Sequence, residues 1–157
     1  MVEARVTVRV QADDFDVATE TERLGTGFGA VASFVGLCRD EDGRLEALEL
    51  EHYPGMAEAQ IEAVAREAAE RWPVGALTVV HRFGRIRPDE RIVLVLAASR
   101  HRDAAFDAVR FVMDYLKTDA PFWKKEWLVG GGEGQWVSAK ESDDRSRDRW
   151  GDPPARR

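Results

Sequence analysis

Positively charged side chains gather around one predicted helix in the second half of this chain. They are, in order, Arg100, His101, Arg102, Lys117, Lys124 and Lys125. A helix N-terminus presents free backbone N–H groups that favour an anion, and an arginine there adds a two-pronged donor. A single surface charge is more often simply solvated, and a lysine in a last helical turn complements the helix dipole. The whole set around one helix, in a chain of net charge −6, predicts a site for an anionic ligand.

The helix between these cations is predicted over residues 103–117. One apolar stripe is expected on it, formed by Phe106, Val109, Met113 and Leu116. Ala120-Pro121 ends the helix, because the residue before a proline is pushed out of the α region. Its length has a consequence for the site. Fourteen steps at 1.5 Å each separate Asp103 from Lys117 by roughly 21 Å, too far for one small anion to touch both ends.

Lys124 and Lys125 follow the helix on a predicted strand. Neighbours on a strand point to opposite faces, so one lysine can face a pocket while the other is solvated. A buried lysine near other cations has a lowered pKa, which is how a lysine becomes a base or a nucleophile. The aromatic residues around them, Phe122, Trp123 and Trp127, are predicted to belong to the core.

Composition limits the class of protein. The 157 residues suit one domain, predicted over 1–143, with a loosely ordered charged tail over 144–157. The negative net charge argues against nucleic-acid binding, including binding of RNA through the stretch Phe122–Trp127. No apolar run approaches the ~20 residues of a membrane span, and the N-terminus lacks the apolar core of a signal peptide. A cytoplasmic protein without membrane contact is expected.

The order of the predicted elements indicates an α+β fold. Strands are expected over 4–10, 30–37, 45–53, 76–83, 92–98, 122–129 and 135–140, a short helix or loop over 13–24, and a helix from Pro54 to Trp72. From Leu45 to Val129 the order is β-α-β-β-α-β, which places helices on one face of a largely antiparallel sheet. The added strands at both ends either enlarge that sheet or form a second one.

Other reactive residues carry weaker signals. Cys38 in an apolar strand is interpreted as a small buried hydrophobe, although Arg39 beside it slightly favours a thiolate. One cysteine permits neither an intrachain disulfide nor a cysteine-based zinc site, and His52 and His81 have no partner at metal-ligand spacing. No metal and no cofactor are therefore predicted. Gly36 within its strand suggests a bulge or a close backbone approach.

Three stretches resemble the large, catalytic subunit of molybdopterin synthase. They are Leu50–Met56 (LEHYPGM), Ser99–Arg102 (SRHR) and Met113–Glu126 (MDYLKTDAPFWKKE), and the late Trp136-Val137 and Glu141–Asp143 fit as well. The resemblance runs from about Gly29 to Trp150. The family often has valine at Cys38, in keeping with a structural cysteine. It often has arginine at Lys140, where lysine keeps the charge and loses the two-pronged geometry.

The resemblance implies an α/β hammerhead fold with an added antiparallel sheet, and an activity. Such an enzyme converts cyclic pyranopterin monophosphate to molybdopterin. It transfers two sulfurs from the C-terminal Gly-Gly thiocarboxylate of a small ubiquitin-like sulfur-carrier subunit. Two large subunits form a homodimer within a heterotetramer. The resemblance maps pocket residues onto Arg39, His101, Arg102, Lys117, Lys124, Lys125, Glu126 and Lys140, and of these Lys117 and Lys124 are predicted to be catalytic.

An alternative of another class stays open on the residues alone. A non-catalytic adaptor could use the same basic groove to bind the acidic C-terminal tail of a partner protein. Pterin turnover distinguishes the two hypotheses, because an adaptor would bind the tail and form no product.

Overall fold

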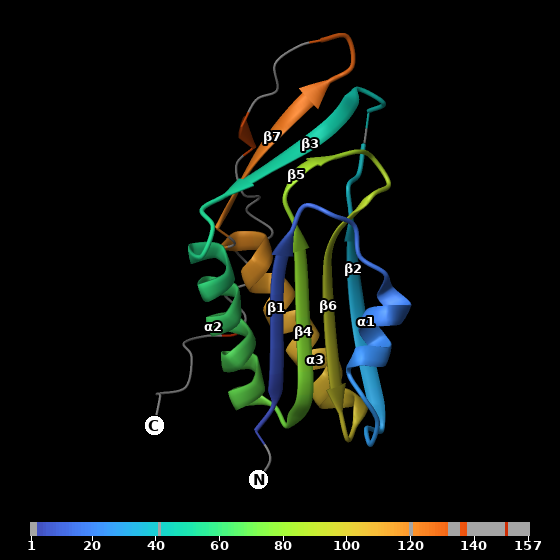
Figure 1. Ribbon diagram of the computed structural model, residues 1–157, viewed down its shortest axis with the longest axis vertical. Helices are drawn as coiled ribbons and strands as arrows, with labels where there is room; N and C mark the ends of the chain where they lie inside the picture. The colour runs from blue at the N-terminus through green and yellow to red at the C-terminus, as the bar shows by residue number, and fades with distance from the viewer. Residues whose placement is uncertain (1–2, 41, 120, 132–135, 138–149, 151–157) are drawn as a thin grey trace.

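The protein is built from two four-stranded sheets set end to end, and two long helices pack on one face of the sheet that has the longer strands (Figure 1). The computed structural model describes residues 3–40, 42–119, 121–131, 136–137 and 150. The first sheet has the order β1-β4-β6-β2, with β1 Arg5–Gln11, β4 Val74–Arg82, β6 Arg91–Ser99 and β2 Ala30–Leu37. The second has the order β5-β3-β7-β8, with β5 Gly84–Ile86, β3 Leu45–His52, β7 Phe122–Leu128 and β8 Trp136–Val137. The helices are α1 Val17–Arg23, α2 Met56–Arg71 and α3 Arg102–Thr118.

The α+β class is confirmed, and the strands of the central motif divide between the two sheets. β4 and β6 pair in the first sheet, whereas β3 and β7 pair with each other in the second. The one parallel pair among the described strands is β1 with β4. The motif is therefore not one continuous sheet. The added strands do both things that were left open: β1 and β2 enlarge the first sheet, and β8 extends the second sheet.

The main core lies between the first sheet and the α2–α3 layer. Leu77 and Val79 point from β4 into this core, where they meet Ile61 of α2 and Phe111 of α3. The alternate residues of β4 and β6 pack on the other face against the segment around α1. Because both central strands are buried on both faces, they are apolar along almost their whole length. This core fixes where α3 begins and ends, and so where its cations lie.

The buried stripe of α3 differs from the predicted one in one residue. Val109, Met113 and Leu116 are buried as expected, but Phe106 is 63% exposed. At 3.6 residues per turn, Phe106 falls at the margin of the stripe that Ala105 and its successors define. Trp123 is likewise not a core residue: it is 46% exposed and meets Tyr53 edge-on with 5.5 Å between ring centroids.

Other boundaries shift by a few residues. α2 begins at Met56 rather than Pro54, because Gly55 takes a positive φ of 87° as its N-cap and its N–H bonds Glu58. The predicted bulge in β2 is confirmed by a register shift between Gly36 and Leu37. β5 is a short strand that the sequence did not predict.

The predicted tail is described at one residue. Trp150 packs edge-on against Trp72 of α2 and Phe111 of α3, and its indole N–H donates to an Asp114 carboxylate oxygen. The rest of 144–157, the predicted domain end at residue 143, and Lys140 lie outside the described residues.

Candidate active site

The end of α3 and the beginning of β7 bring Lys117 and Lys124 to the same place. Lys117 is in the last turn of α3 and exposed, and Lys124 is the third residue of β7 and half-buried. Both charges contribute to lowering the pKa of His81, the next-to-last residue of β4, so both lysines lie within electrostatic range of this imidazole. The two residues predicted to be catalytic are thus brought together where the first sheet meets the second.

His81 is the buried histidine on which both lysine charges act. Its ring stacks on Phe122 with centroids 3.9 Å apart and planes 11° from parallel. Its side chain is 7% exposed, and Nδ1 lies 2.9 Å from the Arg82 carbonyl oxygen. The pKa of His81 is lowered to about 4, chiefly by burial; the Arg82 carbonyl contact raises it, and the charges of Lys124, Lys117 and His52 lower it. His81 is therefore neutral at physiological pH.

The sequence did not predict this histidine as part of the site. In the sequence, His81 is a polar residue at the end of an apolar strand. It occupies the next alternate position after Leu77 and Val79, which are buried on one face. Such a position predicts a polar side chain at the edge of the core. Which cations surround it depends on α3 and β7, which lie far away in sequence.

Arg39 lies in the loop that follows β2, directly after Cys38. Cys38, the residue before it, is 2% exposed and belongs to a small cluster with Leu50 and Ile86, against which Phe122 also packs. The Cys38 N–H donates to the Glu90 carbonyl at 2.8 Å, and the Asp89 N–H donates to the Cys38 carbonyl at 2.7 Å. These bonds fix the start of the loop on which Arg39 is exposed.

Cys38 itself is not poised for thiol chemistry. Burial raises the pKa of its thiol, and the charges of Glu90 and Asp40 add to that increase. A thiol held protonated in an apolar cluster is a poor nucleophile. This agrees with its interpretation as a buried structural residue.

Lys125 and Glu126 divide between the two faces of β7. Lys125 lies opposite Glu49 of β3 and Trp136 of β8, and its Nζ is 4.8 Å from the Trp127 ring centroid. Glu126 shares the face of Lys124, opposite Leu48. The predicted alternation of the two lysines is confirmed, and the structure does not bring Lys125 to the face of Lys124.

His101 and Arg102 lie at the far end of α3. His101 is the exposed N-cap and Arg102 the exposed first residue of the helix. The loop before them is held closely by β2: the Gly29 N–H donates to the Ser99 carbonyl at 3.0 Å. A Cβ added at Gly29 would lie 2.2 Å from the Arg100 carbonyl oxygen, so only glycine fits there. Within one chain, these two residues do not meet Lys117.

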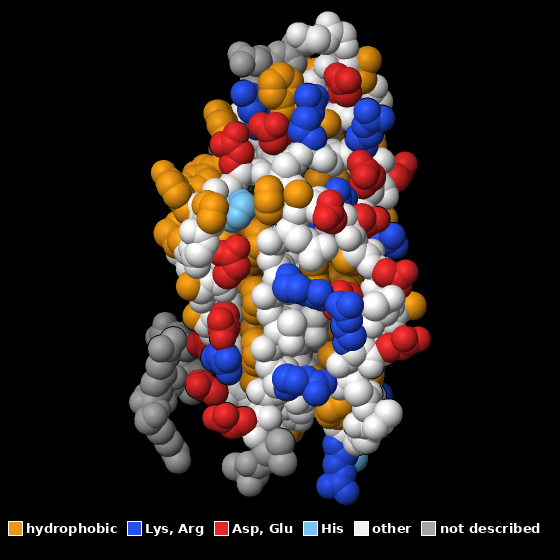
Figure 2. Space-filling view, in the orientation of Figure 1, with side chains coloured by type: hydrophobic (Ala, Val, Ile, Leu, Met, Phe, Trp, Pro, Cys, Tyr) orange, Lys and Arg blue, Asp and Glu red, His pale blue; other side chains and the backbone are white. Residues whose placement is uncertain are grey.

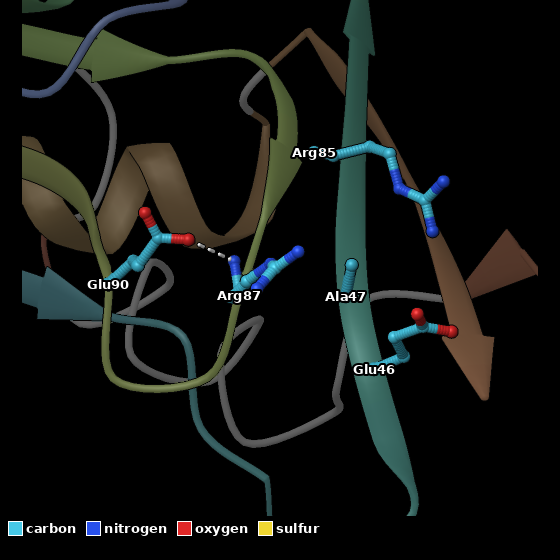
Figure 3. Close-up of a pocket in the computed structure, with 5 residues that line it drawn as sticks. All are labelled: Glu46, Ala47, Arg85, Arg87 and Glu90. Carbon is cyan, nitrogen blue, oxygen red and sulfur yellow. Dashed lines mark hydrogen bonds between the residues drawn. The ribbon is translucent and has the colours of Figure 1, made fainter. Parts of the chain in front are cut away.

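Two hollows on the surface of the described part of the chain are lined by residues other than these. A hollow of about 260 Å³ lies elsewhere, between β3 and the turn after β5, and is lined by Glu46, Ala47, Arg85, Arg87 and Glu90 (Figure 3). In it the Arg87 backbone N–H donates to a Glu90 carboxylate oxygen at 2.7 Å. Two arginines and two glutamates balance one another, so this hollow does not suit an anion. None of the predicted site residues lines it.

Charge on the visible face is mixed rather than uniformly basic. Figure 2 shows Lys and Arg side chains interspersed with Asp and Glu over both sheets. A continuous basic surface, as nucleic-acid binding requires, is not seen on this face. Within the described residues, no group of three or more His, Cys, Asp or Glu side chains could hold a metal ion. No helix of the described part is long and apolar enough to cross a membrane.

Comparison with known proteins identifies the family of this α+β chain. The sequence model of the family described as "MoaE protein" matches residues 10–119. The chain belongs to this MoaE family.

Individual relatives agree over most of the chain. A molybdopterin synthase catalytic subunit from Mesorhizobium japonicum is 63% identical over 147 residues, 92% of this chain and 92% of that protein. One from Brucella melitensis is 58% identical over 151 residues, 94% of this chain and 93% of that protein. Among solved structures, a molybdopterin biosynthesis MoaE protein from Burkholderia ambifaria has a TM-score of 0.80 at 47% identity and covers 93% of this chain and 98% of its own.

Proposed function

We propose that this protein is the catalytic subunit of a molybdopterin synthase. It converts cyclic pyranopterin monophosphate to molybdopterin by transferring two sulfurs from the C-terminal thiocarboxylate of a small ubiquitin-like carrier subunit. The observation that carries the proposal is the meeting of Lys117 and Lys124 beside a neutral His81, in a chain of the MoaE family. The names of its relatives support the same activity.

The chemistry fits the residues. The pterin carries a cyclic phosphate, the carrier ends in an anionic thiocarboxylate, and negative charge develops on oxygen as sulfur is transferred. Lys117 and Lys124 stabilise that developing charge, because preorganised cations act most strongly where charge appears in the transition state. The substrate-binding groups, besides the two lysines, are Arg39, His101, Arg102, Glu126 and Lys140. Lys125, on the opposite face of β7, is left out of this proposed site.

The carrier tail ends at the lysine pair. A slim, extended C-terminus ending in two glycines can enter where a folded domain cannot, and its carboxyl-derived group is the anion that the lysines attract. The enzyme works in the cytoplasm as a homodimer of this chain with one carrier at each end.

Each active site takes residues from both chains of the dimer. α3 places His101 and Arg102 roughly 21 Å from Lys117, so a single pterin cannot reach both ends of one helix. A two-fold dimer repeats each contact with exchanged partners and can unite one chain's Lys117 with the other's Arg102. β2 is an edge strand with exposed Val31 and Leu37, which supports an interface on this side.

Mixed dimers test this sharing. When Lys117→Ala and Arg102→Ala subunits are combined, one of the two sites collects both defects and the other is intact. About half of the normal activity should then return in the mixed dimer. If each site lies within one chain, both sites stay damaged and mixing restores nothing.

The activity itself is tested with the two substrates. Incubation with cyclic pyranopterin monophosphate and thiocarboxylated carrier should yield dithiolene, and a carrier without its terminal glycines should yield none even if it binds. Tail binding without product would identify the adaptor instead. Full activity with the truncated carrier would contradict the thiocarboxylate mechanism.

A further inference from the structure

His81 is a buried histidine whose position is explained neither by the core nor by the predicted set of cations. It continues the row of Leu77 and Val79 that faces the α2–α3 layer, at the point where that core ends. Phe122 covers one side of its ring, and Phe122 lies only two residues before Lys124. The same strand therefore carries both the aromatic contact of His81 and one of the two lysines.

The hydrogen bond to Arg82 determines which nitrogen carries the proton. A backbone carbonyl can only accept, so Nδ1, 2.9 Å from the Arg82 oxygen, must be the donor. In a neutral ring the other nitrogen, Nε2, then has a free lone pair and accepts. The Nε2 lone pair can therefore accept a hydrogen bond from a donor at the junction.

The donors that act on this ring include two ammonium groups. Lys124, Lys117 and His52 are the charged or titratable groups that act on His81, and Lys124 acts most strongly. An ammonium carries three N–H donors and no acceptor, so it pairs with a lone pair and is repelled by another cation. A protonated imidazole would add a positive charge to the pair, whereas a neutral one can bind and orient a lysine.

We propose that His81 is a positioning residue of the active site, and that its imidazole, fixed by Phe122 and the Arg82 carbonyl, offers Nε2 as acceptor to an ammonium group of the Lys117–Lys124 pair. This deepens the proposed function and rests on it. His81 does not touch the reacting atoms. It sets the direction in which a lysine meets the substrate, and a displacement of about 1 Å at such a group can cost 10²-fold in rate.

Two substitutions separate this role from a structural one. His81→Phe keeps an aromatic ring on Phe122 and removes the acceptor, whereas His81→Gln keeps an acceptor and removes the ring. Single-turnover sulfur transfer is measured at saturating pterin and carrier, with thermal melting of both variants. We expect His81→Phe to fold and to lose about 10- to 100-fold in single-turnover rate with little change in KM, and His81→Gln to recover most of that loss. A folded His81→Phe variant with the wild-type rate would overturn the proposal.

A measurement without turnover keeps the inference separate from the proposed function. In wild-type protein labelled with ¹⁵N at histidine, Nε2 of His81 should show the chemical shift of an unprotonated nitrogen. In protein labelled at lysine, the Nζ titration of Lys117 or Lys124 should change in His81→Phe and be close to wild type in His81→Gln. A protonated Nε2, or lysine titrations unchanged in both variants, would overturn the positioning role. Wild-type protein that shows these signals but forms no dithiolene would instead refute the proposed function.

Discussion

The neutral state of His81 makes the stability of the fold depend on pH in a defined direction. Its pKa is about 4 in the folded protein and 6.5 in an unfolded chain. Between these values the unfolded chain binds the extra proton and the folded protein does not. The free energy of unfolding should therefore be highest above pH 6.5 and fall as the pH decreases towards 4.

The size of the effect follows from the two pKa values. At 1.36 kcal/mol for each pKa unit, the gap corresponds to about 3 kcal/mol of stability lost on acidification. That is a large part of the 5–15 kcal/mol typical of a folded domain. Burial is the main cause of the low pKa, so the effect should persist in moderate salt, which screens the charges of Lys124 and Lys117 but not the desolvation.

The assay compares wild type with His81→Phe, which cannot titrate. Urea denaturation at steps from pH 4 to pH 7 gives the free energy of unfolding of each protein. Carboxylates common to both proteins contribute equally, so the difference between the two curves isolates the histidine. Relative to His81→Phe, the wild type should lose about 3 kcal/mol of unfolding free energy between pH 7 and pH 4. Parallel curves over this range would show that His81 is not buried neutral and would refute the reasoning.

Three further substitutions test individual contacts. Cys38→Val should leave sulfur transfer unchanged and alter the free energy of unfolding by less than about 1.5 kcal/mol, since valine fills the same apolar position; a folded variant that has lost transfer would make the thiol a sulfur shuttle. Gly29→Ala should cost about 1–3 kcal/mol by urea denaturation, because the new Cβ meets the Arg100 carbonyl at 2.2 Å; an unchanged transition midpoint would contradict that contact. Trp150→Ala should destabilise by about 2 kcal/mol, since it removes the ring contacts with Trp72 and Phe111; a neutral result would mean that the chain end is not docked in solution.

Much of the local structure could be predicted from sequence because it depends on neighbours along the chain. The spacing of Val109, Met113 and Leu116 predicts α3, and Ala120-Pro121 in the sequence predicts its end close to the observed last residue, Thr118. The alternation along β7 separates Lys124 from Lys125, and Gly36 marks the bulge in β2. Each of these is a short-range rule, satisfied within a few residues.

The pairing of the strands is a long-range property and could not be predicted in the same way. β3 reads as one more strand of a β-α-β-β-α-β motif, but its partner is β7, about 75 residues later, and not the central sheet. Periodicity shows which side chains share a face and does not show which strand lies beside it.

Some residues of the candidate site could be predicted from local sequence, and others depend on contacts between distant segments. Lys117 and Lys124 could be proposed from charge, spacing and resemblance, and the structure brings them together. His81 could not, because its role depends on α3 and β7 folding over the end of β4. The packing of Cys38 fixes the start of the loop that carries Arg39, while Lys125 lies on the opposite face of β7 from Lys124.

The central claim is that Lys117 acts on the reacting groups, and a single-turnover experiment tests it most directly. Lys117→Ala is compared with Arg110→Ala, which removes an exposed cation from the same helix away from the predicted site. Both variants should fold and bind the carrier. Lys117→Ala should transfer sulfur about 10²–10³ times more slowly than wild type, the usual cost of losing a positioned charge in the transition state, and Arg110→Ala should be close to wild type. A Lys117→Ala variant with a near-normal rate, or equal losses in both variants, would contradict the account.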